Sequence, residues 1–292
     1  MQLSQQGAGG RVVARRPRKR HLSAASAYVL LMALAVLFLS PFGWLIITAL
    51  KDLSELAAFP VLFWPAHPEW GNFVQALTSI NFGAYATNSF ILATMNSVLV
   101  TFSSALVGFG FARLRGIGKR QLFLLMLSTM MLPSILTVIP TYVIFARLGL
   151  IDTYWPWVLG GLGSSPFLSF LFRQFFSGIP VELEEAAIID GCGYFRIFWQ
   201  IFLPLSLPVI VTSLILSFNG VWGDYITPSL FLNQDNTTLS VAMSAGYTDP
   251  HGDVLTNVVA AGAILYILPV LVLFFFAQRS FVRGITTTGL KG

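Results

Sequence analysis

The sequence predicts an all-α, polytopic membrane protein with six transmembrane helices. Hydrophobic residues make up 55% of the 292 positions, charged residues only 10%, and the mean hydropathy is +0.76. A soluble domain of this length carries about a quarter charged residues, so this much apolar surface could not be buried in one aqueous core. Six apolar stretches approach the roughly 20 residues that a helix needs to cross a bilayer, namely 27–50, 88–112, 122–145, 155–172, 203–222 and 257–278.

The third and fourth stretches contain helix-breaking residues. The segment GGLGSSP, from Gly160 to Pro166, interrupts the fourth stretch, and Pro133 and Pro140 lie in the third. Such residues are tolerated in a membrane helix when neighbouring helices pack closely or satisfy the freed carbonyl groups. We therefore expect kinks at these positions.

Charge divides the chain into regions and sets its orientation. A basic tail (1–26) precedes the first span and its loop (27–84), a transmembrane core (85–278) follows, and a short tail (279–292) ends the chain. The first tail could be a nucleic-acid arm, but beside a hydrophobic span a solvated tail that fixes orientation is the favoured interpretation. It holds Arg11, Arg15, Arg16, Arg18, Lys19 and Arg20.

Basic residues collect on one side of the predicted membrane. With six spans, that side has both termini, the loop at 113–121 and the loop at 181–204, whereas the other side has only Lys51 and Arg147. Because basic loops are retained in the cytoplasm, we expect both termini there and the loops 51–87 and 223–256 outside. The first span is followed by no cleavage site, so it is not expected to be a signal peptide.

The spans argue against several classes of protein. They contain almost no ionisable side chain, although ion-driven secondary carriers tend to use such groups inside the membrane. No metal-binding spacing such as HExxH and no Gly-rich phosphate loop is present, so we expect neither an enzyme nor a cofactor bound by this chain. An ion-driven carrier and a membrane scaffold remain as alternatives.

The loop at 181–204 stands out from the apolar chain around it. Pro180 and the acidic residues Glu182, Glu184 and Glu185 favour a helix start, and Gly191 favours its end. A second short helix is predicted from Tyr194 to Phe202, closed by Pro204. The two helices would form a compact elbow outside the membrane. Its small alanines could let another protein approach closely, although an ordinary helical loop is the alternative.

The residues of this elbow resemble a known family. Glu185-Ala186-Ala187, three residues, Gly191, nine residues and then Ile201-Phe202-Leu203-Pro204 match the EAA loop of binding-protein-dependent ABC importer permeases. The stretches FLFRQFFSGIPVELEEAAIIDG and QRSFVRGITTTGLKG resemble the carbohydrate-uptake branch, especially the second permease subunit of maltose-type systems. The resemblance covers residues 27–292 and leaves the basic tail unmatched.

The resemblance implies a type I ABC importer permease fold in a bacterial or archaeal plasma membrane. The EAA loop would be a coupling helix seated in a cleft of a separate ATPase, and the tail 279–292 would lie near the ATPase pair or only anchor orientation. The implied contact residues are Glu185, Ala186, Ala187, Asp190 and Gly191, with Ile201, Leu203 and Pro204 joining them to the fifth span.

The same resemblance implies a set of partners. They are a second, homologous permease subunit, two ATPase subunits that bind ATP and magnesium, and an extracytoplasmic solute-binding protein, within membrane lipid and without nucleic acid. The expected substrate is a sugar or oligosaccharide, with glycerol phosphate or a polyol as alternatives. The sequence does not choose among them.

Four polar or aromatic residues at the outer end of the fifth span could contact such a substrate: Asn219, Trp222, Asp224 and Tyr225. Aromatic faces and hydrogen-bonding groups suit sugars. Because tryptophan and tyrosine also gather at membrane interfaces, anchoring is the favoured alternative for them.

Overall fold

The computed structural model describes the backbone of residues 19–288 and the side chains of 25–276 and 278. This part of the chain is helical and has no strand beyond one isolated bridge between Thr248 and Val254. The predicted all-α class is therefore confirmed. The basic side chains of residues 1–24 and 279–292 lie outside the described residues, so the expectations for both tails stay predictions.

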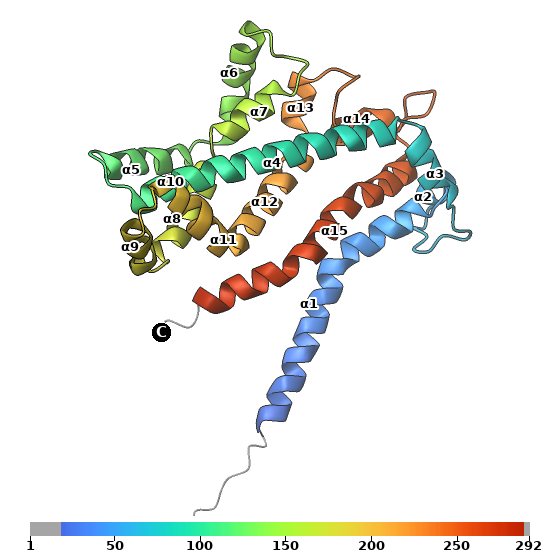
Figure 1. Cartoon of the computed structure of the whole chain (residues 1–292). Coiled ribbons are helices and arrows are strands. Elements are labelled where there is room, and N and C mark those ends of the chain that lie inside the picture. Colours follow the sequence, from blue (N-terminus) through green and yellow to red (C-terminus); the bar gives the residue numbers. More distant parts are fainter. Residues whose placement is uncertain (1–18, 289–292) are drawn as a thin grey trace, which may run out of the picture.

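Figure 1 shows one long helix, α4, running the length of a helical body, with α5, α9 and α10 at one end and α2, α3 and α14 at the other. The helices are α1 (Lys19–Ala49), α2 (Leu53–Leu56), α3 (Gly71–Thr78), α4 (Phe82–Arg113), α5 (Lys119–Thr129), α6 (Ser134–Arg147), α7 (Trp155–Leu162), α8 (Pro166–Ser177), α9 (Val181–Ile189), α10 (Tyr194–Ile197), the π-helical turn η1 (Phe198–Phe202), α11 (Leu203–Leu205), α12 (Leu207–Trp222), α13 (Ile226–Phe231), α14 (Leu239–Gly246) and α15 (Thr256–Thr288).

Only some of the predicted spans are single helices. Ala25–Ala49, Phe82–Arg113 and Thr256–Phe276 are long and apolar enough to cross a membrane. Two further candidates are bent pairs: α5 and α6 meet at 98°, and the segment Tyr194–Leu205 meets α12 at 81°. The predicted fourth span is divided into α7 and α8. The count of six spans therefore stays a prediction.

Small residues let α4 serve as the central helix. A Cβ added to Gly108 would lie 2.6 Å from Cβ of Phe172 on α8, and one added to Gly161 on α7 would lie 2.9 Å from Cβ of Leu99. Such close approach brings polar groups together, and Ser103 Oγ donates a hydrogen bond to the Gly161 carbonyl at 2.7 Å. In lipid, packing and interhelical hydrogen bonds of this kind hold helices together, because burial from water contributes nothing there.

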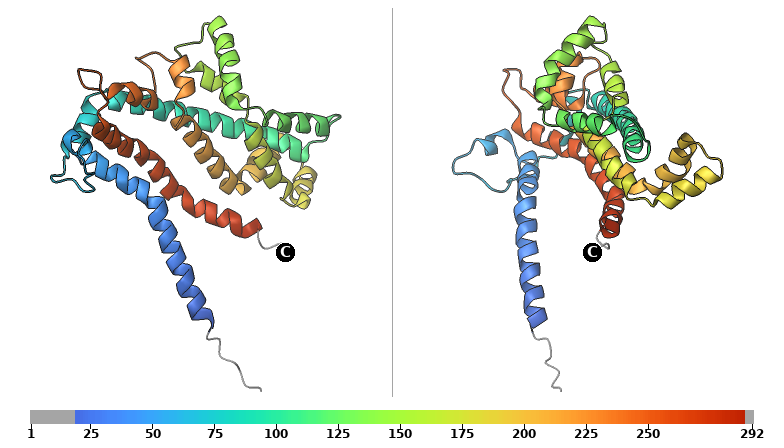
Figure 2. Two further views of the ribbon diagram at one scale, coloured as in Figure 1. Left: turned by 180° about the vertical axis from the view of Figure 1, so that it is seen from behind. Right: turned by 90° about the vertical axis from the view of Figure 1, so that its left-hand side faces the viewer.

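A knot of hydrogen bonds joins the first and last long helices at the end of the molecule that carries α2 and α3. The Asn72 amide donates to the carbonyls of Ala49 and Lys51, both at 2.9 Å. The Asn257 amide, in the first turn of α15, donates to Asn72 Oδ1 at 3.1 Å and to the Lys51 carbonyl at 3.2 Å. From this knot α1 and α15 diverge toward their other ends, as both views in Figure 2 show.

Tyr247 makes a second link at the same end. Its hydroxyl donates to the Ala76 carbonyl at 2.8 Å, which connects the loop before α15 to α3. Burial raises the pKa of Tyr247 to about 12, so this hydroxyl keeps its proton and remains a donor at physiological pH. The predicted outer loops, 51–87 and 223–256, thus meet at one end of the molecule.

Gly108 and Gly110 allow a matched test of the α4–α8 packing. Gly108→Ala should destabilise the protein by about 1–3 kcal/mol, because the added methyl group overpacks the contact with Phe172. Gly110→Ala meets only Leu114 Cδ1 at 4.0 Å and should be neutral or stabilising, since alanine favours a helix over glycine. Thermal unfolding in detergent measures both, and equal shifts would contradict the packing argument.

Candidate functional site

The elbow predicted at 181–204 begins with α9, a helix that ends at a left-handed glycine. The N–H groups of Gly191 and Cys192 donate to the carbonyls of Ile188 and Ala187 at 3.0 and 2.9 Å. Gly191 has φ +81°, a conformation that glycine adopts at little cost. Pro180 precedes the helix, so both ends of α9 lie where the sequence predicts them.

The second half of the elbow differs from its prediction. Instead of one helix closed by Pro204, α10 leads into the π-helical turn η1, where the Leu203 N–H donates to the Phe198 carbonyl five residues earlier. Pro204 is the second residue of α11 and lies within the helical path that runs on from η1. The helical path continues to Leu205 and bends at Ser206 into α12. The predicted end at Pro204 is therefore wrong.

An aromatic cluster fastens this second half to α4 and α8. The ring of Phe202 lies 5.0 Å from Phe109 and 5.5 Å from Phe176, and Phe198 lies 5.3 Å from Phe109, each measured between ring centroids. All four side chains are buried. Tilted and edge-to-face pairs of this kind add to the stabilisation that burial gives. The elbow is thus packed onto the ends of two core helices.

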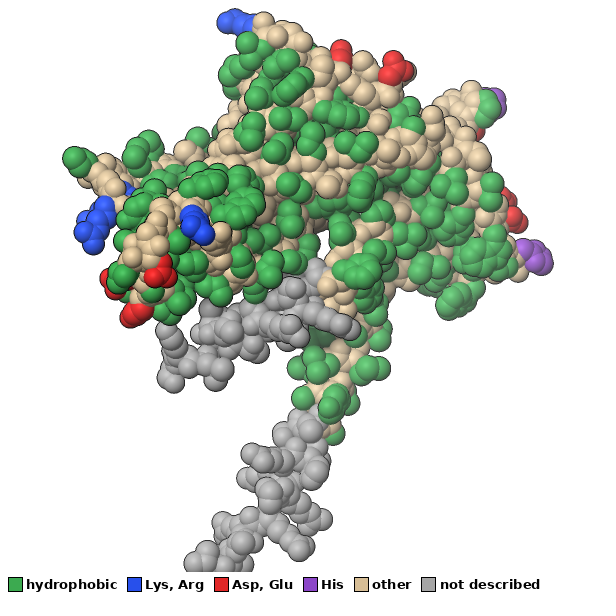
Figure 3. Space-filling view, in the orientation of Figure 1, with side chains coloured by type: hydrophobic (Ala, Val, Ile, Leu, Met, Phe, Trp, Pro, Cys, Tyr) green, Lys and Arg blue, Asp and Glu red, His purple; other side chains and the backbone are tan. Residues whose placement is uncertain are grey.

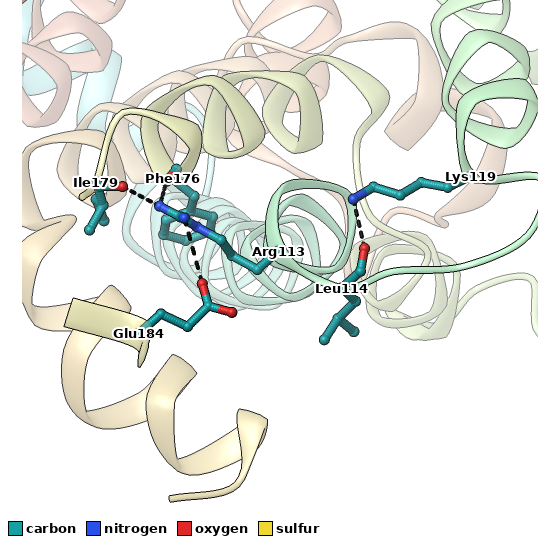
Figure 4. Close-up of polar contacts among 6 residues, drawn as sticks. All are labelled: Arg113, Leu114, Lys119, Phe176, Ile179 and Glu184. Atoms are coloured by element: carbon teal, nitrogen blue, oxygen red, sulfur yellow. Dashed lines mark hydrogen bonds and ion pairs between the residues drawn. The ribbon is translucent and has the colours of Figure 1, made fainter. Parts of the chain in front are cut away.

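Arg113, the last residue of α4, holds α9 against the same cluster (Figure 4). Its guanidinium lies 3.5 Å from Glu184 Oε2 on α9, and Nη2 donates to the Phe176 carbonyl at 2.7 Å and also to the Ile179 carbonyl. The same group lies over the Phe202 ring, 5.0 Å from its centroid. Among the residues that the structure describes, this is the one ion pair.

The ion pair between Arg113 and Glu184 is buried, so the loss of either partner costs more stability than in an exposed pair. The side chains of Arg113 and Glu184 are only 10% and 9% exposed, so each charge depends on the other and on the carbonyls for stabilisation. The two carbonyls lie at and just beyond the C-terminal end of α8, where a helix attracts cations. One guanidinium therefore connects the end of α4, the end of α8 and the helix α9.

The face of α9 turned away from the core is exposed and mixes acidic, small and apolar side chains. Glu182, Glu185, Ala186 and Ile189 lie on it, and Ile189 is 86% exposed. Of the two alanines predicted to form the surface, only Ala186 lies there, whereas Ala187 is 7% exposed and packs into the aromatic cluster. In the part of the chain that the structure describes, Glu185 has no hydrogen-bond or ion-pair partner.

The remaining predicted coupling residues lie around this face. Asp190 and Gly191 are exposed at its end, and Pro204 is exposed near the start of α12. Ile201 and Leu203 are half-buried against the aromatic cluster. They connect the elbow to the helix that follows.

The four predicted substrate residues do not share one surface. Trp222 is 3% exposed; its ring stacks on Tyr266 of α15 at 5.4 Å, and Nε1 donates to the Tyr266 carbonyl at 3.2 Å. Asp224 Oδ1 accepts from the Thr227 N–H in the first turn of α13 at 3.1 Å. Asn219 and Tyr225 are exposed. Trp222 and Asp224 thus make structural contacts within the chain.

A pocket at the other end of the molecule was not predicted from the sequence. It has a volume of about 450 Å³ between the turn after α3 and the helix α14. Its lining is neutral and partly polar: Ser79, Ile80, Asn81, Tyr85, Gln234, Thr237, Val241, Ala242, Ala245 and Gly246. These residues come from two segments far apart in the sequence, so no local motif could have revealed the pocket.

Comparison with known proteins decides the family. Residues 103–287, which include the elbow, match the family described as binding-protein-dependent transport system inner membrane component. The chain belongs to this family. It is a membrane-embedded transport subunit and not an enzyme, and such subunits work with a separate ATPase and a binding protein.

The sequences of several relatives align with nearly the whole chain. The probable ABC transporter permease YurM of Bacillus subtilis is 33% identical over 281 residues, which cover 94% of this chain and 91% of the relative. The maltodextrin permease MalD of Streptococcus pneumoniae is 29% identical, covering 94% and 98%. The arabinooligosaccharide permease AraQ of Bacillus subtilis is 31% identical, covering 89% and 93%.

A solved structure confirms the fold. A chain of a bacterial ABC transporter involved in the import of the acidic polysaccharide alginate superposes with a TM-score of 0.77 at 19% identity, covering 92% of this chain and 100% of that chain. The predicted ABC importer permease fold is therefore confirmed.

Glu184 and its neighbour Glu185 allow a test of the ion pair. Glu184→Gln should weaken the seating of α9 by on the order of 1–3 kcal/mol, because it leaves the Arg113 charge without its counter-ion. Glu185→Gln changes an exposed, unpartnered carboxylate and should leave α9 unchanged. Amide hydrogen exchange across residues 181–191 should be faster in the first variant alone. Equal exchange in both would contradict a stabilising role for the pair.

The two glycines of the elbow allow a second matched test. Gly191→Ser must place a side chain at φ +81°, which costs about 1–2 kcal/mol. Gly193→Ser should be neutral or stabilising, because Gly193 caps the start of α10 in an extended conformation that suits serine. Neither glycine has a neighbour within 4 Å of an added Cβ, so only backbone conformation distinguishes them. The temperature of thermal unfolding should fall for Gly191→Ser only.

Proposed function

We propose that this chain forms half of the translocation pathway of an ATP-driven sugar or oligosaccharide importer. It would pair with a second, homologous permease subunit, bind two ATPase subunits on the cytoplasmic side and receive its substrate from an extracytoplasmic binding protein. In this arrangement six spans place both termini in the cytoplasm. The ATPase subunits bind the nucleotide and its magnesium ion, and their movement displaces the elbow of this chain.

One observation carries the proposal: the elbow has an exposed face for a partner and a buried attachment to the core helices. The outward face of α9 offers Glu185, Ala186 and Ile189 to a partner's surface. On its inner side, Glu184 is bound to Arg113, and Ala187 packs among the phenylalanines. A push on the outer face is therefore transmitted to α4 and α8 through buried contacts.

The mechanism follows from this attachment. When the ATPase subunits close, the partner's cleft would move α9 as a unit, because a short helix held by an ion pair and aromatic packing transmits force without unfolding. The bend at Ser206 links that movement to α12, which packs on α4 and α15. Rigid-body movement of these helices would open the pathway alternately to each side. An ion-driven carrier is not favoured by the family match.

The substrate class rests on the relatives. Those related proteins are named for transport of maltodextrin, galactooligosaccharides, diacetylchitobiose and arabinooligosaccharides. The pocket between the turn after α3 and α14 has a neutral lining with amide, hydroxyl and aromatic groups, which suits an uncharged sugar better than an anionic one. We propose this pocket, rather than the buried Trp222, as the part of the outer surface that meets the substrate or its binding protein.

A charge reversal on the outward face of α9 tests the coupling role. Glu185→Lys should reduce co-purification of the ATPase and abolish uptake, while the protein remains in the membrane. Glu69→Lys makes the same change on an exposed residue at the opposite end and should leave ATPase co-purification unchanged. Normal uptake and normal ATPase retention with Glu185→Lys would refute the assignment of α9.

The substrate is measured in the same cells. Uptake of labelled maltodextrin, arabinooligosaccharide and diacetylchitobiose would be compared with that of glycerol phosphate and a polyol, with and without Glu185→Lys. Uptake of an oligosaccharide that is lost in the variant supports the substrate class. Uptake of glycerol phosphate alone would overturn the substrate and leave the coupling role standing.

A further inference from the structure

A basic pocket of about 390 Å³ lies where α4 ends and α5 begins, apart from the outward face of α9. Three cationic side chains line it, Lys119 and Arg120 from α5 and Arg173 from α8, together with Phe111, Gly116, Gly118, Gln121 and Phe123. This lining contains no carboxylate. Figure 3 shows Lys and Arg side chains at this end of the molecule next to hydrophobic ones.

The three cations keep free hydrogen-bond donors. Lys119 Nζ donates to the Leu114 carbonyl at 2.7 Å, as Figure 4 shows, which uses one of its three N–H groups. The Arg173 guanidinium carbon lies 4.1 Å from the centroid of the Phe123 ring, a cation–π contact, and among the described residues its N–H groups have no hydrogen-bond partner. Arg120 is exposed. Like charges held together without an acidic partner repel each other, and an anion would remove that repulsion.

An apolar groove of about 250 Å³ continues directly from this pocket. It shares Phe111, Gly116 and Lys119 with the pocket. The rest of its lining is Val107, Gly110, Leu114, Arg115, Ile117 and Leu122. From Leu114 back to Val107 the groove follows α4 for roughly 10 Å at 1.5 Å per residue. It therefore leads from the end of the apolar helix toward the hydrocarbon depth.

We propose that the pocket and the groove together bind an anionic phospholipid of the cytoplasmic leaflet. Its phosphate would lie among Lys119, Arg120 and Arg173, and one acyl chain would lie along Val107, Leu114 and Leu122. Basic pockets between membrane helices on this side suit such headgroups. A free phosphate would use the basic pocket but not the groove, which is why the groove points to a lipid.

The position of this site connects it to the elbow. Arg173 belongs to α8, and the Phe176 carbonyl that accepts from Arg113 lies less than one turn further along the same helix. A bound headgroup would hold α5 against α8 through Arg173 and Phe123. The lipid would thus stabilise the helix on which the elbow rests.

Native mass spectrometry of the full chain, purified in detergent with the partners it retains, tests the proposal. The probes are phosphatidylglycerol, phosphatidylcholine with the same acyl chains, a short-chain phosphatidylglycerol and inorganic phosphate. Long-chain phosphatidylglycerol should bind most tightly. Lys119→Gln with Arg173→Gln should weaken it by roughly 25-fold, since each basic side chain near a headgroup contributes about fivefold.

Two further variants keep the result interpretable. Arg120→Gln changes an exposed side chain without removing packing, so a loss of lipid affinity there cannot come from misfolding. Arg196→Gln removes a cation on the same side of the protein, bonded to Gln200 at 3.0 Å outside the pocket, and should leave lipid binding unchanged.

Each other outcome overturns the proposal. Equal binding of phosphatidylcholine removes the role of the basic pocket, and equal binding of the short-chain lipid or of inorganic phosphate removes that of the groove. Unchanged lipid affinity in the pocket variants places the lipid elsewhere. Loss of the ATPase subunit in those variants, with lipid affinity unchanged, would assign the basic pocket to a protein partner.

Discussion

The contacts of the buried Arg113 guanidinium are the interactions on which the elbow at 181–204 depends. A cation at the end of a membrane helix is ordinarily an anchor that reaches toward water or headgroups. Here it turns inward, where two carbonyls, one carboxylate and one aromatic face receive it. In the part of the chain that the structure describes, no other cation is paired with a carboxylate, so this charge and the rings around it are what hold α9 to the ends of α4 and α8.

Two kinds of packing serve the two parts of the molecule. Along α4, glycine, serine and alanine bring helices close enough for side chains to reach backbone groups of a neighbouring helix, as Ser104 does when its hydroxyl accepts from the Ser165 N–H at 2.9 Å. At the elbow, phenylalanines fill a wider space between helix ends. Close backbone packing resists sliding, whereas interlocked rings hold an element as one body. Together these contacts hold α9 and η1 against the ends of α4 and α8.

The sequence predicts the helices of this structure and their ends better than the contacts between residues far apart in the chain. Hydropathy identified the helical class, and Pro180 and Gly191 located both ends of α9, because these signals act within a few residues. The 98° bend between α5 and α6 was beyond reach, since prolines permit a kink but the packing of other helices sets its angle. The partnership of Arg113 with Glu184 joins segments far apart in the chain, and each residue alone had an adequate local explanation.

The orientation of side chains around α9 and α12 was equally hidden. Apolar residues occur on every side of α9, with Leu183 and Ile189 both exposed, so the sequence does not reveal that Ala187 faces inward and Ala186 outward. Trp222 stood beside polar neighbours and suggested an accessible ring, but its stacking partner Tyr266 belongs to a distant helix.

Over its N-terminal half, the first helix, α1, makes few contacts with the rest of the described chain. Its apolar stretch from Ala25 to Leu39 is exposed along its whole length, and in a membrane acyl chains would cover it as well as another protein's apolar surface. Because lipid tails are as apolar as these side chains, hydrophobicity does not drive this stretch onto another helix, and any pairing there depends on close packing and interhelical hydrogen bonds.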